Sequence, residues 1–173
     1  EFREFRRAAI PFVLIGLLIY TALYVGAELL VTHYADRNRF FVVRTASPST
    51  YDHVILGSSH AAVFDYRDLN DRLEAMTGTR IVNLAIPGAG VTVNRFVLDY
   101  FLTRHDTRSI IYVLDSFGFY ARAWNEERLQ DVGLFARAPF DPELGWLLAR
   151  RAATRGTAVD YFTGFSKINN PDR

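Results

Sequence analysis

The pattern of apolar and polar positions opens with a long uncharged stretch. Residues 8–27, AAIPFVLIGLLIYTALYVGA, carry no charged side chain. At about 1.5 Å of rise per residue, a helix of this length extends about 30 Å, the thickness of the hydrocarbon core of a bilayer. The stretch also lacks the polar stripe of a soluble surface helix. The pattern therefore predicts a transmembrane anchor within residues 1–34, and the lipid bilayer as a partner.

The charges beside this stretch are asymmetric. Arg3, Arg6 and Arg7 precede it, whereas Glu28 follows it. The positive-inside rule then predicts a single-pass protein of the cell membrane, with a cytoplasmic N-terminus and a periplasmic or extracellular C-terminal domain. A cleaved signal peptide is the rival interpretation, because small residues occur at 25–27. The apolar run is longer than the usual signal core of about 7–15 residues, which favours the anchor.

Residues 35–50 are polar, then apolar, then rich in serine and proline, and predict a linker. A domain over 51–173 follows. The continuous apolar run 54–56 predicts a strand covered on both faces, and 80–86 and 109–114 predict a second strand and a third buried strand. Asp65 is expected to cap a helix that ends near Met76, with Gly78 as its stop.

A further helix is predicted by apolar residues at helical spacing, namely Val93, Phe96, Val97, Tyr100 and Phe101. Strands alternating with helices predict an α/β fold: a flavodoxin-like, three-layer domain with a parallel sheet.

A helical extension is expected from about residue 119. In it, Asp141 caps a helix that runs to about Arg155. Trp124, Phe135 and Trp146 are expected to fill a secondary core.

Composition narrows the function. With 173 residues, half of them hydrophobic, the chain can bury one ordinary core. The net charge is +1, from 20 basic and 19 acidic residues dispersed along the chain. The composition therefore gives no sign of a basic surface for binding nucleic acid. Cysteine is absent, which excludes disulfides, thiolate metal sites and a cysteine nucleophile.

The candidate chemistry lies where the strands end. In parallel α/β sheets, ligands bind outside the carboxyl ends of the strands. That edge is predicted to gather seven residues: Ser58, Ser59, His60, Gly88, Gly90, Asp115 and Ser116. The serines could equally serve only as helix caps. Glycines 88 and 90 do not complete a dinucleotide loop, because position 93 is valine. His60 and Asp115 alone make no metal site, so we expect neither cofactor nor metal.

Two blocks resemble the SGNH, or GDSL-like, hydrolase superfamily. They are residues 55–59, ILGSS, and residues 83–90, NLAIPGAG. The likeness covers roughly residues 51–120 and is closest to the membrane-anchored branch related to polysaccharide O-acylation. It implies that Ser59 is the nucleophile and that the N–H groups of Ser59 and Gly88 form an oxyanion hole. Ser58, His60, Gly90 and Asp115 would line the site.

Two features of that family are missing. No Asn follows the third strand in a Gly-x-Asn pattern, and no Asp-x-x-His block occurs. The SGNH-like domain therefore looks as if it lacks its C-terminal part, and the general base is expected from sequence beyond Arg173. The four histidines, at positions 33, 53, 60 and 105, are not expected to form a triad with Ser59. Asp115 either orients such an external histidine or accepts a hydrogen bond from a neighbouring loop.

Two functions remain open. The first is a membrane-anchored serine hydrolase or O-acyltransferase acting on acyl esters of cell-envelope glycans. The second is a non-catalytic accessory subunit that keeps the fold and joins other integral membrane proteins. A cleft that binds glycan without covalent chemistry is a weaker third.

Overall fold

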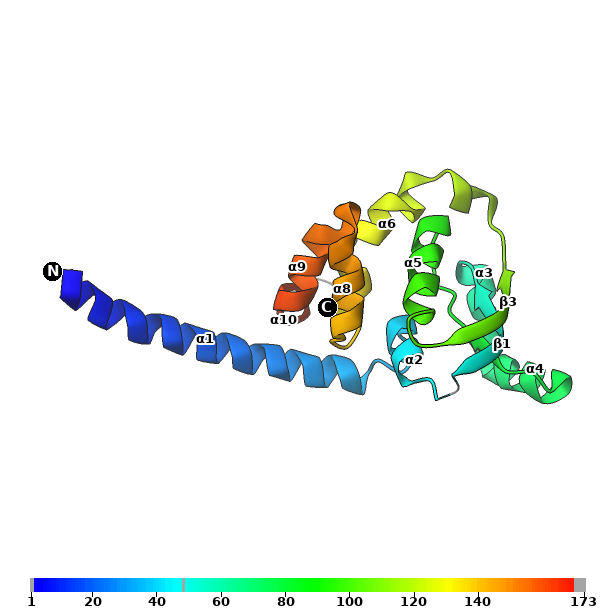
Figure 1. Cartoon of the computed structure of the whole chain (residues 1–173), viewed down its shortest axis with the longest axis horizontal. Helices are drawn as coiled ribbons and strands as arrows, with labels where there is room; N and C mark the ends of the chain where they lie inside the picture. The colour runs from blue at the N-terminus through cyan, green and yellow to red at the C-terminus, as the bar shows by residue number, and fades with distance from the viewer. Residues whose placement is uncertain (1, 48, 170–173) are drawn as a thin grey trace.

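A long N-terminal helix projects from an α/β body (Figure 1). This computed structural model describes residues 2–47 and 49–169. Glu1, Pro48 of the predicted linker and residues 170–173 of the predicted domain lie outside that range. Helix α1 is Phe2–His33, and it contains the stretch Phe5–His33, with a mean hydropathy of 2.2 in its most apolar window. The one long apolar helix predicted from the sequence is thus present.

The predicted linker contains a helix that belongs to the core. Helix α2 is Arg39–Thr45, and Asn38 caps it by accepting hydrogen bonds from the N–H groups of Phe40 and Phe41. Phe40 and Val43 are 2% and 0% exposed and pack in the main core. The predicted linker therefore does more than connect α1 to the domain.

The sheet is parallel and has the order β2-β1-β3 among the described residues. Strand β1 is Thr50–Leu56, β2 is Ile81–Asn83 and β3 is Asp106–Tyr112. In register, Val54 of β1 lies between Val82 and Ile110. The predicted α/β architecture with a parallel sheet is confirmed, although β2 is shorter than residues 80–86.

Helices cover both faces of the sheet. Val54 and Leu56 point into the main core, which is completed by the helix α5, Val91–Phe101. Ile55, between them, points to the other face, where the short helix α3, Ser59–Ala62, and the helix α4, Leu69–Thr77, lie. All five apolar residues that predicted α5 are buried, so that prediction is confirmed.

Strand β3 is not buried as predicted. Ile110 and Ile111 are 47% and 45% exposed, because β3 is an edge strand whose two faces are incompletely covered. An apolar run indicates a strand, but it does not say where in the sheet the strand lies.

Helix α4 also differs from prediction. It begins at Leu69, after the 3₁₀ segment η1, Val63–Asp68, because Arg67 and Asp68 interrupt the helix with φ values of 50° and 58°. Asp65 pairs with Arg39 instead of capping the helix. Met76 is 80% exposed, whereas Gly78 stops the helix as predicted.

The C-terminal extension is helical, as predicted. It contains η2 (Ser116–Phe119), η3 (Arg122–Trp124), α6 (Glu126–Gln130), α7 (Val132–Ala136), α8 (Pro142–Arg150), η4 (Ala152–Thr154), α9 (Arg155–Thr163) and α10 (Phe165–Ile168). Helix α8 ends at Arg150, short of the predicted Arg155. Phe135 is buried in the main core, but Trp146 is 57% exposed and does not fill a secondary core.

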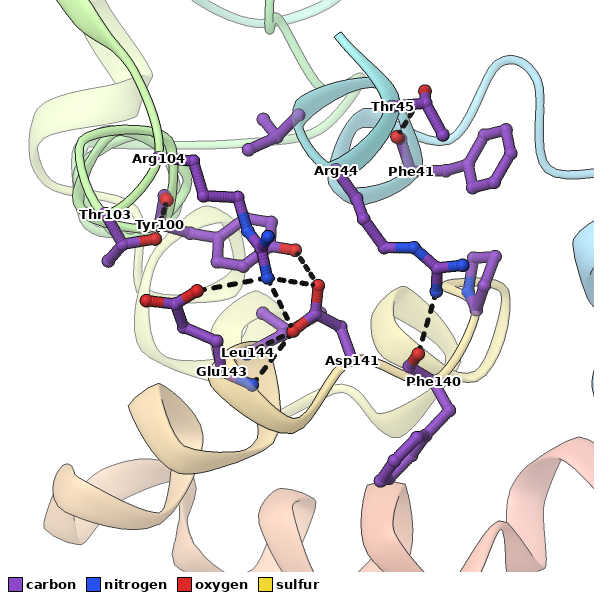
Figure 2. A network of polar contacts seen from close by, with 12 residues as sticks. Phe41, Arg44, Thr45, Tyr100, Thr103, Arg104, Phe140, Asp141, Glu143 and Leu144 are labelled. Carbon is purple, nitrogen blue, oxygen red and sulfur yellow. Dashed lines mark hydrogen bonds and ion pairs between the residues drawn. The ribbon is translucent and has the colours of Figure 1, made fainter. Parts of the chain in front are cut away.

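A buried carboxylate joins this extension to α5 (Figure 2). Asp141 is 3% exposed and caps α8 by accepting from the N–H groups of Glu143 and Leu144, as predicted. It also accepts from the Tyr100 hydroxyl at 2.7 Å and from the Arg104 guanidinium. Burial alone would raise the pKa of Asp141. The hydrogen bonds and the charge of Arg104 together have the larger effect, so the pKa lies below its ordinary value.

Candidate functional site

The turn after β1 is fixed by a glycine that no other residue can replace without strain. Gly57 has φ +150°, and a Cβ there would lie 2.8 Å from the Ala61 Cβ and 3.0 Å from the Val113 carbonyl oxygen. Its N–H donates to the Asn94 Oδ1 at 3.0 Å. The turn thereby buries Ser58, which is 1% exposed, and leaves the next residue, Ser59, exposed.

Asp115, just after β3, joins two residues of this turn. The Ser58 hydroxyl donates to its Oδ2, and the His60 Nδ1 lies 2.7 Å from its Oδ1. The hydrogen bond from Ser58 is the main cause that lowers the pKa of Asp115, and the His60 contact adds to it. An ionised carboxylate only accepts, so His60 donates to it from Nδ1, which leaves Nε2 outside this contact.

This contact agrees with one of the two alternatives for Asp115. It accepts from a neighbouring loop, and one of its donors is a histidine of this chain. The pair was missed from sequence because His60 and Asp115 are 55 residues apart, and only the parallel pairing of β1 with β3 brings their ends together. Within residues 2–47 and 49–169, no hydrogen bond joins the Ser59 hydroxyl to a histidine.

Gly88 lies at the same edge of the sheet as Ser59. Beyond β2 the chain stays alongside β1, because the Leu84 N–H donates to Ile55 at 2.9 Å and the Ile86 N–H donates to Gly57 at 3.2 Å. Gly88 follows two residues later with φ +74°. Across the described chain, its N–H donates to no backbone or side-chain oxygen. The N–H of Ser59, the first residue of α3, likewise has no partner within its own helix.

Gly90 is a packing residue. It is buried, and a Cβ there would lie 2.5 Å from the Asn125 side chain. Asn125 accepts from the Thr92 N–H and donates to the carbonyl oxygens of Gly118 and Ala121. Gly90 thus allows this amide to join the start of α5 to the extension, and it does not line an open site.

Asn94 is a second buried amide that sequence reasoning missed. It is 2% exposed, accepts from Gly57 and donates to the Gly90 carbonyl oxygen at 2.9 Å. It therefore joins the two loops that carry Ser59 and Gly88. The signal in the sequence was an amide on the apolar side of α5, next to Val93.

The other histidines lie elsewhere, as expected. His53, in the middle of β1, lies 2.7 Å from the Ser109 hydroxyl, and His105 bonds the Val43 carbonyl oxygen through Nε2. His33 ends α1. Of the four histidines, only His60 stands at the edge that carries Ser59.

A cleft of about 920 Å³ adjoins the loop that ends in Gly88. Its apolar floor includes Ala85, Ile86 and Pro87. Its charged lining residues are Arg37, Arg39, Arg67, Arg128, Arg137, Asp36, Asp65 and Asp68. The buried Nε of Arg128 has no hydrogen-bond partner among the described atoms, and it lies 3.9 Å from the place of a Cβ on Gly88.

Comparisons of this chain with protein-family models, with curated proteins and with solved structures give no match. The function therefore rests on the residues and their geometry.

Proposed function

We propose that this chain is a membrane-anchored, SGNH-like serine esterase or O-acyltransferase, and that it acts outside the cytoplasm on acyl esters of cell-envelope glycans. The observation that carries the proposal is the Asp115–His60 pair beside the exposed Ser59, at the sheet edge that also holds Gly88. A nucleophile, an oriented base and free backbone N–H groups are the parts that acyl transfer needs.

The roles follow from the contacts. The Ser59 hydroxyl attacks the acyl carbonyl, and the N–H groups of Ser59 and Gly88 stabilise the oxyanion. Side chains of adjacent residues diverge on a helix, so the Ser59 proton passes to the His60 Nε2 through one water. His60 then protonates the departing alcohol. Water, or an acceptor hydroxyl in the transferase, releases the acyl group and restores Ser59.

The anchor is supported by α1. The most apolar window of Phe5–His33 has none of its residues buried in the protein, so its apolar side chains need an apolar solvent. The arginines before it favour a cytoplasmic N-terminus, which places the body on the outer side.

The cleft supports an anionic substrate. Five arginines and three aspartates line it, and guanidinium groups bind carboxylates and phosphates in a fixed geometry. The lining also includes Ala62 of α3, the helix that begins at Ser59, and we propose that a glycan held in the cleft presents its ester to Ser59.

Labelling with a fluorophosphonate probe tests the proposal. We expect the full chain in detergent to be labelled, and Ser59→Ala to abolish labelling while it stays folded. Ser109→Ala, which removes an exposed hydroxyl in the middle of β3 that contacts His53, should be labelled like the wild type. A folded wild-type protein that reacts no more than Ser59→Ala would contradict the enzyme.

The alternative, an accessory subunit of a membrane complex, also has support. The Ser59 hydroxyl has no direct histidine partner in the part of the chain described above. Gly16 and Gly26 of α1 have open space where a Cβ would lie, which allows close approach of another helix. An unlabelled protein that purifies from its native membrane with a stable integral membrane partner would favour this role.

A further inference from the structure

Helix α1 is fastened to the C-terminal end of the body. The Tyr20 hydroxyl donates to the Thr163 carbonyl oxygen at 2.9 Å. One turn later, the Tyr24 ring lies where a Cβ on Gly164 would be, and one turn after that Glu28 pairs with Lys167. Residues 20, 24 and 28 share one face of a helix. The segment 163–167 therefore runs along α1 beside three successive turns.

These contacts set the depth of the segment relative to a bilayer. Tyr20 precedes Ala27, the last residue of the uncharged stretch, by seven positions, or about 10 Å along the helix. If residues 8–27 span the hydrocarbon core, Thr163 lies about 10 Å inside its outer boundary and Gly164 about 5 Å inside it, whereas Lys167, beside Glu28, lies at the boundary itself. The first acidic residue after the stretch, Glu28, is neutralised there by Lys167, whose side chain is 1% exposed.

Large apolar side chains are exposed on this same part of the body. Phe162 is 42% exposed and Phe165 is 57% exposed. The Phe162 ring rests on Gly145 of α8, where a Cβ would lie 2.5 Å from it. The next residue, Trp146, is also exposed, and the Arg150 guanidinium lies 5.4 Å from its ring centroid. Aromatic rings beside cationic side chains are typical of groups at the headgroup level of a membrane.

We propose that Phe162 and Phe165 insert into the outer leaflet of the bilayer, so that the α9–α10 end of the body contacts lipid beside α1. This inference rests on the membrane span of the proposed function, but not on its chemistry. The favoured occupant is lipid because the contacts of Tyr20, Tyr24 and Glu28 place the segment 163–167 along the outer third of the hydrocarbon core. A mostly apolar cavity of about 530 Å³ between α1 and α10, lined by residues such as Leu23, Leu30 and Ile168, extends from this depth outward past Ala27.

Single fluorophores can measure this depth, because the chain has no natural cysteine. The full chain carrying Phe165→Cys, labelled with an environment-sensitive dye, is reconstituted in vesicles of phosphatidylcholine and phosphatidylglycerol, with or without nitroxide-labelled lipid. Phe162→Cys is a second reporter, in case one substitution impairs folding. Met76→Cys on α4 is the exposed control away from α1, and Ile15→Cys reports on the middle of α1.

We expect the dyes at positions 165 and 162 to emit at shorter wavelength than the dye at 76 and to lose most of their intensity with nitroxide lipid. The dye at 15 should be quenched as well, and the dye at 76 should not. If 15 is quenched but 162 and 165 behave like 76, the docking is overturned and the anchor stands. If 15 also escapes quenching, the anchor is overturned and the docking with it.

Discussion

Asp115 binds the residues on either side of the proposed nucleophile. Its hydrogen bond from Ser58 is within a buried turn, whereas its contact with His60 reaches an imidazole that is 71% exposed. One carboxylate thus fixes the turn and orients the candidate base. Its role can be separated from its contribution to folding by a substitution that keeps the shape and removes the charge.

Asp115→Asn should lower turnover of an acyl ester by about 10³-fold, because the neutral amide no longer fixes the His60 tautomer or stabilises the imidazolium. The pH dependence of kcat should change along with its magnitude. The matched control is Asp52→Asn, at the opposite end of β1, where a carboxylate with a lowered pKa pairs with Arg108. Equal activity of the wild type and Asp115→Asn would argue against His60 as the base.

The buried carboxylate of Asp141 predicts how stability depends on pH. Its pKa in the folded protein is lowered below the ordinary 3.8, so its contribution is present above that value and is lost as pH falls through the folded pKa. Asp141→Asn should therefore lower the free energy of unfolding by about 2 kcal/mol at pH 7.

The loss should shrink as the solution becomes acidic. Urea unfolding at several pH values measures it, with Asp131→Asn, a partly exposed cap of the short helix α7, as the comparison. A destabilisation that stays constant down to acidic pH would contradict the proposed charge network.

At the residue scale, sequence alone predicted where the polar residues gather but not which of them touch. The strand ends placed Ser58, His60 and Asp115 at one edge, yet the division between a buried Ser58 and an exposed Ser59 depends on the bend at Gly57. The amides of Asn94 and Asn125 were missed because their partners are backbone groups of distant loops, which leave no pattern in the sequence.

At the scale of elements, hydrophobic periodicity was reliable where one face of an element meets a full core. Helix α5 is such a case, and its apolar stripe is buried as predicted. Hydrophobic periodicity was unreliable where the packing of other elements decides whether a residue is exposed. Strand β3 reads as a core strand but forms an edge, and the predicted linker contributes Phe40 and Val43 to the core because α2 closes against α5.

The contact between α1 and the segment 163–167 can be tested at Gly164. Gly164→Ala should destabilise the attachment of α1, because the methyl group overlaps the Tyr24 ring and φ is +69°. Gly78→Ala is a closely matched control: φ there is +67° with open space around it, so it carries only the backbone cost of about 1–2 kcal/mol.

Limited proteolysis between α1 and the body in detergent measures the difference. We expect faster cleavage near residues 34–38 in Gly164→Ala than in Gly78→Ala. Equal cleavage would mean that the Tyr24 contact does not hold α1 in place.

At the scale of the whole molecule, the proposed topology places the two ends of α1 on opposite sides of a membrane. In intact cells, a membrane-impermeant maleimide should label Met76→Cys, on the body, and should label Phe5→Cys only after permeabilisation. Both side chains are well exposed, at 80% and 69%, so access is set by the membrane. Labelling of Phe5→Cys in intact cells would reverse the orientation.

The three successive contacts at Tyr20, Tyr24 and Glu28 also limit where the chain can work. If α1 spans the membrane as proposed, a body held against α1 stays at a fixed height above the membrane, whereas a body on a flexible tether would reach many heights. The edge of the sheet that carries Ser59 would then react only with molecules that reach that height above the membrane. Glycans still carried on lipid, or polymers emerging at the bilayer surface, would meet this requirement far more often than chains diffusing freely in the surrounding fluid.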